Sequence, residues 1–138
     1  MKRIKRCLPI LLVCALLMAT TSFATVKASE QLARYNIYAA SMGNGKIGID
    51  VSVTATGIMK EVGVQNIFIY KLGTYGYELV ESYDKDDPGM IATNTWEYVD
   101  TIYYQGETGE DYQVVVSIYA KDTNNNSDSR SRSFNITT

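Results

Sequence analysis

Residues 109–120 read GEDYQVVVSIYA, and this stretch does more than any other to decide the fold. A turn containing a glycine and two acidic residues leads into a tyrosine, and an apolar residue then follows at every second position. A period of two is typical of a β-strand that buries one of its faces. The residues predicted to point into a core are Tyr112, Val114, Val116, Ile118 and Ala120.

The same alternation recurs along the chain. Residues 47–56 place Ile47, Ile49, Val51, Val53 and Ala55 on one face, after a tight turn at Gly43-Asn44-Gly45. No stretch of ten or more residues has the apolar period of a helix. About seven short strands separated by turns indicate one all-β domain over residues 34–136. The expected strands are 34–41, 47–56, 64–72, 77–83, 93–104, 112–120 and 129–136.

Tyr112 stands at the start of a strand and just after a turn, an arrangement called a tyrosine corner in immunoglobulin-like sandwiches. Residues 109–120 resemble the strand of fibronectin type III domains in which a Pro-Gly-x-x-Tyr turn leads into a Val-x-Val-x-Tyr-Ala-like run. The resemblance implies a single immunoglobulin-like antiparallel sandwich, with the Tyr112 hydroxyl bonded back to the turn. The chain also resembles small exported proteins of Gram-positive bacteria whose function is unknown. This resemblance implies export and a fold, but it implies no activity.

Residues 1–28 are predicted to be a secretory signal peptide. A basic start, residues 2–6, precedes a short apolar run from Leu8 to Ala19. This run is shorter than the roughly 20 residues that a membrane-spanning helix needs. Small residues allow cleavage after Ala28, which we favour, or after Ala24. We therefore expect a signal-peptide helix followed by a secreted protein that no membrane holds after cleavage.

Removal of the signal peptide changes the charge and the chemistry of the chain. It takes away both cysteines and five of the 13 Lys and Arg residues, which leaves 8 basic against 15 acidic residues and a net charge of −7. An acidic protein avoids nucleic-acid phosphates, so we exclude nucleic-acid binding. The length that remains suits one domain, expected to be a monomer.

The composition argues against an enzyme. The chain contains no histidine, and the exported part contains no cysteine, so the common nucleophilic systems and zinc ligand sets are missing. Paired carboxylates remain, but Asp50, Glu97 and Asp100 fall at polar positions of alternating strands. We interpret them as a solvated surface, and we expect no cofactor.

One loop offers oxygen side chains at alternate positions, as calcium requires. The four candidates are Asp122, Asn124, Asn126 and Asp128. Ser127 stands where an EF-hand needs glycine, and Ser133 stands where it needs the bidentate glutamate. Asn and Asp are also ordinary loop residues, so we favour a plain loop and predict no metal site.

Surplus aromatic residues are the best candidates for binding. If Ile67 and Ile69 point inward, Phe68 and Tyr70 point outward, and the same reasoning turns Val115 and Tyr119 outward. Strands 64–72 and 112–120 are expected to be neighbours. The predicted exposed patch therefore consists of Phe68, Tyr70, Val115 and Tyr119. Cross-strand pairing that only stabilises the sheet is the alternative, and Trp96 and Tyr98 are expected in the core.

These expectations favour a protein-interaction or adhesion module that binds through the patch. A carbohydrate-binding module is the second hypothesis, with Gln113 and Asn66 as polar neighbours of the tyrosines. A structural protein of the cell envelope is the third. The expected partner is a protein or a glycan at the cell surface.

Overall fold

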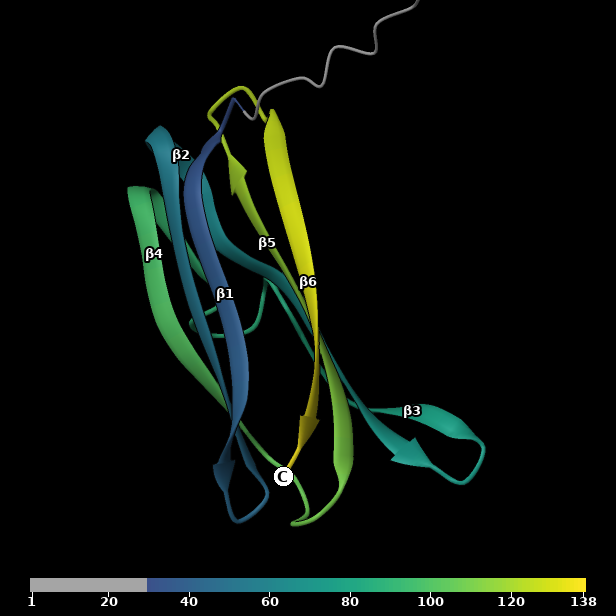
Figure 1. The fold of residues 1–138 in the computed structure, drawn as a ribbon. Coiled ribbons are helices and arrows are strands. Elements are labelled where there is room, and N and C mark those ends of the chain that lie inside the picture. The colour runs from purple at the N-terminus through teal and green to yellow at the C-terminus, as the bar shows by residue number, and fades with distance from the viewer. Residues whose placement is uncertain (1–29) are drawn as a thin grey trace, which may run out of the picture.

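The computed structural model describes residues 30–138, which form an all-β structure (Figure 1). Every strand pair in this part is antiparallel. No helix within these residues is long and apolar enough to cross a membrane. The predicted signal peptide, residues 1–28, lies outside the described residues. The strands are β1 (Leu32–Gly43), β2 (Lys46–Gly73), β3 (Gly76–Asp84), β4 (Ile91–Gln105), β5 (Asp111–Lys121) and β6 (Ser127–Thr137).

Strand β2 organises the sheet because it is 28 residues long and has different neighbours along its length. Its first part, Lys46–Thr54, pairs with β1 on one side and with β4 on the other. Its second part, Glu61–Gly73, pairs with β5 and β3, and β6 pairs with β5. The result is a strongly curled sheet, compatible with a β-sandwich, in which β1 and β6 run beside each other (Figure 1).

The prediction of about seven strands is wrong by one. The two segments expected at 47–56 and 64–72 are parts of the continuous strand β2. The backbone between them stays extended, because Met59 and Val62 are buried and still pair with β4. A bulge after Thr54 lets the strand change direction without ending.

A glycine permits the close contact near the middle of β2. Gly63 has φ of +148°, a conformation that other residues rarely adopt. A β-carbon at this position would lie 2.4 Å from the carbonyl oxygen of Met90. The same oxygen accepts a hydrogen bond of 2.7 Å from the backbone N–H of Val64. The residues just before β4 are thereby bonded to β2 where its two halves meet.

The core agrees with the period of two. The five residues expected to point inward from 47–56 are buried, and so are those from β5. The side chains of these two sets pack with those of Ile67, Ile69 and Ile37 in one cluster. Because alternate residues are committed to this core, the remaining residues of each strand form its outer face.

The expectation that both Trp96 and Tyr98 lie in the core is half wrong. Tyr98 is buried, and its hydroxyl donates a hydrogen bond of 2.8 Å to the carbonyl oxygen of Gly89. Trp96 is 52% exposed. It lies opposite the bulge of β2, where four residues of β2 stand against this one residue of β4.

Tyr112 joins the start of β5 to the preceding turn. Its ring is fully buried and packs edge-on against Tyr104, with 5.9 Å between ring centroids. Its hydroxyl oxygen accepts a hydrogen bond of 2.8 Å from the backbone N–H of Glu107, which precedes it in the turn. The bond anchors the connection between β4 and β5 to the core.

We predict that Tyr112→Phe lowers the free energy of unfolding by about 1–2 kcal/mol, because the N–H of Glu107 loses its partner while the ring still fills the core. Tyr104→Phe is the matched control, since the structure records no hydrogen bond from its hydroxyl within residues 30–138, and it should cost less than about 0.5 kcal/mol. Chemical denaturation of both variants measures the difference. Equal losses would show that the hydroxyl bond does not stabilise the turn.

Candidate functional site

The outer face of β3, β2 and β5 carries an apolar stripe. Phe68 pairs with Val115 of β5 on one side and with Ser82 of β3 on the other. Two residues further along β2, Tyr70 pairs with Leu79 of β3. These side chains lie on the face opposite the buried Ile67 and Ile69, because successive residues of a strand point to opposite faces.

The stripe continues onto the hairpin formed by the end of β2 and β3. Leu72 pairs with Tyr77, and a tight turn joins Gly73 to Gly76. Leu79, Tyr77 and Leu72 are 54%, 44% and 41% exposed. The hairpin projects from the rest of the sheet (Figure 1). The term outer stripe is used from here on for six residues: Phe68, Tyr70, Leu72, Tyr77, Leu79 and Val115.

Sequence reasoning placed three of the six members of the outer stripe on the outer face. Phe68, Tyr70 and Val115 do lie on that face, but they are half-buried and not exposed as expected. The remaining members depend on the register between β2 and β3, which a bulge at Val80 shifts by one residue. The available signal was the tight turn at 73–76, which puts residues 72 and 77 opposite each other.

Tyr119 does not belong to the outer stripe, and the expectation that it is exposed is wrong. It is only 5% exposed, yet it lies outside the core cluster. Its hydroxyl donates a hydrogen bond of 2.6 Å to the carboxylate of Glu61. The connection from β3 to β4 comes close to this pair, since the ammonium of Lys85 lies 4.0 Å from the same carboxylate. The β3–β4 connection, which is distant in sequence from Tyr119, therefore lies beside the hydrogen-bonded pair of Tyr119 and Glu61.

The bond between Tyr119 and Glu61 changes the acidity of both groups. The Tyr119 hydroxyl holds the pKa of the Glu61 carboxyl below its ordinary value of 4.5, although partial burial opposes this. Burial, reinforced by the negative carboxylate, raises the pKa of the Tyr119 hydroxyl. The pair is therefore a neutral phenol bound to an ionised carboxylate at neutral pH, an arrangement suited to holding the β3–β4 connection in place.

Polar side chains continue the outer face beyond the stripe. Gln113 pairs with Tyr70, and its amide donates to the side-chain oxygen of Asn135 over 3.4 Å. In a neighbouring row, the hydroxyls of Ser117 and Ser131 lie 2.7 Å apart. Asn66 pairs with Ser117 and so completes this row. The face is therefore aromatic and aliphatic toward the hairpin of β2 and β3, and it carries amide and hydroxyl groups toward β6.

The weak calcium candidates lie in the loop between β5 and β6. The Asp122 carboxylate accepts hydrogen bonds from the backbone N–H groups of Asn124 and Asn126, both 2.9 Å long. Gln31 also donates to Asp122 through its amide, over 3.3 Å, and to Asp128 through its backbone N–H, over 2.8 Å. Within residues 30–138, no group of three or more acidic side chains is arranged to hold a metal ion. The carboxylates of Asp122 and Asp128 thus accept hydrogen bonds from other groups of the chain.

Comparison with known proteins adds no further residues to this site. No protein-family model matches the chain, and no curated protein matches it.

We predict that Glu61→Gln lowers the free energy of unfolding at neutral pH by about 1 kcal/mol, because the Tyr119 hydroxyl loses a charged acceptor. The folded pKa of Glu61 lies below its ordinary value. Its contribution to stability is therefore complete above that value and disappears as the pH falls through the folded pKa. The gap between parent and variant should begin to close as the pH falls below the ordinary value of 4.5 and disappear as the pH falls through the folded pKa.

Urea denaturation as a function of pH measures this gap. Glu97→Gln is the control, because Glu97 is exposed and its side chain makes no hydrogen bond recorded within the described part of the chain. A gap that stays constant from neutral to acidic pH would contradict the ionised role of Glu61.

Proposed function

We propose that the chain is an exported, non-enzymatic binding domain with an immunoglobulin-like, fibronectin type III-like fold. The pairing of β1, β2 and β4 beside β3, β2, β5 and β6 supports two packed sheets that share one long strand. The hydrogen bond between the Tyr112 hydroxyl and the turn before it supports a tyrosine corner. Export rests on the signal-peptide pattern of residues 1–28.

The function that this geometry supports best is protein interaction or adhesion through the outer stripe. The observation that carries the proposal is the continuity of apolar side chains from Phe68 to the exposed hairpin residues Tyr77 and Leu79. A contiguous exposed apolar patch is a common mark of a binding surface on a soluble protein. None of these side chains is needed to fill the core on the opposite face.

Tyrosine suits such a surface physically. It presents a large, rigid ring together with a hydroxyl, and it loses little conformational entropy when a partner orders it. The β-sheet beneath the stripe is held by the buried residues of β2 and β5. The stripe therefore offers an organised surface to a partner, which lowers the cost of binding.

A glycan is the second candidate, because amide side chains flank the aromatic ones. Gln113 lies beside Tyr70, and Asn66 lies beside Ser117 on the same face. A sugar ring needs an apolar surface for stacking and polar groups for its hydroxyls. The Gln113 amide already bonds to a neighbouring strand, and the exposed members of the stripe are partly aliphatic, so we rank this candidate below a protein partner.

We predict that the exported protein is retained by cell-surface material that contains protein, and that Tyr70→Ser/Leu79→Ser reduces the retained fraction at least about tenfold. The control is Tyr103→Ser/Val99→Ser, which removes exposed apolar area from β4. The assay compares intact cell-surface material with the same material after protease treatment and with purified polysaccharide.

Retention that depends on the stripe and is lost after protease treatment supports the protein partner. Retention on purified polysaccharide that the stripe variant loses would instead favour the glycan. Equal retention of the parent, the stripe variant and the control would contradict both, because binding would not require the outer stripe.

A further inference from the structure

The backbone of β3 has one unpaired edge. Among the described residues, β3 pairs only with β2, so the backbone groups on its other side meet no strand. The strand is nine residues long and lies on the projecting hairpin (Figure 1). An open edge of this length can receive an added strand through main-chain hydrogen bonds.

Apolar side chains line this edge. Tyr77 and Leu79 belong to the outer stripe, and Val80, at the bulge, is 41% exposed. A strand added beside β3 would lay its alternate side chains against Tyr77 and Leu79.

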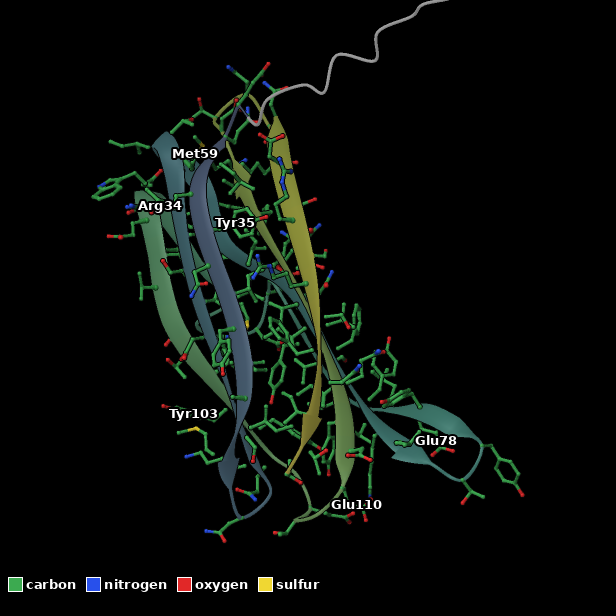
Figure 2. The ribbon with its side chains drawn as sticks, in the orientation of Figure 1. Arg34, Tyr35, Met59, Glu78, Tyr103 and Glu110 are labelled. Atoms are coloured by element: carbon green, nitrogen blue, oxygen red, sulfur yellow. The ribbon has the colours of Figure 1, made fainter. Side chains whose placement is uncertain are left out.

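The edge is also acidic. Residues 71–90 contain five carboxylates against two lysines, and both lysines already have acidic partners. Lys71 binds Glu107 and Glu110, and Lys85 lies near Glu61 and Asp86. Glu78, on β3, is exposed to solvent on the projecting hairpin (Figure 2).

This charge decides which occupant fits. A second copy of the chain would bring its own Glu78 and Glu81 against those of β3, and like charges at a strand interface are destabilising. A basic strand would place ammonium or guanidinium groups near the same carboxylates. Charge complementarity thus selects a basic extended segment and disfavours self-association.

We infer that the free edge of β3 binds an extended segment of a partner protein in which Lys or Arg alternates with apolar residues. The segment adds to the sheet as a further strand. Its apolar residues lie along the outer stripe, and its basic residues lie near Glu78 and Glu81. This inference rests on the proposed protein-interaction function and specifies the chemistry of the partner.

Synthetic peptides test the inference directly with the exported protein produced from the full chain. The probe is a peptide of about ten residues, the length of a strand, in which Lys alternates with Val and Tyr. One counterpart carries Glu in place of Lys, and a second carries N-methyl groups on alternate residues, which remove main-chain donors. Calorimetry measures affinity, and amide hydrogen exchange shows where the peptide protects the protein.

We expect the Lys peptide to bind at least about tenfold more tightly than either counterpart and to slow exchange at β3, with affinity falling as salt is added. Glu78→Gln/Glu81→Gln should weaken binding about tenfold, whereas the control Glu97→Gln on β4 should not. Equal binding of the Lys and Glu peptides would overturn the inference. So would no binding at about millimolar concentration, or protection of β3 through dimerisation of the protein alone.

The failure of this inference can be told apart from the failure of the proposed function. If Tyr70→Ser/Leu79→Ser abolishes retention on cell-surface material while the charge variant and the peptides have no effect, the stripe binds a partner without strand addition. If the stripe variant is retained like the parent, the proposed function itself is wrong.

Discussion

The structure depends on one constraint, which is that a single strand serves two groups of neighbours. Strand β2 pairs with β1 and β4 along its first part and with β5 and β3 along its second part. The change of partners takes place around Gly63, where the backbone adopts a conformation open to glycine and the carbonyl of Met90 approaches. The hydrogen bond from Val64 to that carbonyl bonds the start of β4 to β2. The position of the outer stripe follows from this geometry, because the second half of β2 lies between β3 and β5.

The core and the candidate binding face are two consequences of the same alternation. Ile67 and Ile69 are buried against β5, so Phe68 and Tyr70 are turned to the other side. A short strand would end there, but β2 continues into a hairpin that projects beyond the pairing with β5. The side chains of Leu72 and Tyr77 therefore point outward, and no further strand of the described chain covers them. The surface that we propose for binding is thus an extension of the sheet that carries no core residues of its own.

Much of the fold could be predicted from the sequence, and the reasons for the failures are physical. The burial of alternate residues from Ile47 to Ala55, and of alternate residues in β5, follows from a local period of two. Tyr119 has the same local pattern as Val115, but its exposure depends on Glu61 and on a connection that is distant in sequence. Trp96 lies opposite the bulge of β2 at residues 55–58, and the alternation of apolar residues runs up to Ala55 without marking where the bulge begins. To predict the stripe members on the hairpin, one would need the register between β2 and β3, which a bulge at Val80 sets.

The measurement that tests this account most directly is the stability of Gly63→Ala beside Gly57→Ala. Both glycines lie in β2, but a β-carbon at Gly57 would meet nothing within 4 Å, whereas one at Gly63 would lie 2.4 Å from the Met90 carbonyl oxygen. We predict that Gly63→Ala lowers the free energy of unfolding by at least about 2 kcal/mol and that Gly57→Ala changes it by less than about 1 kcal/mol. Similar values for the two variants would contradict the claim that the path of β2 at Gly63 holds the structure together.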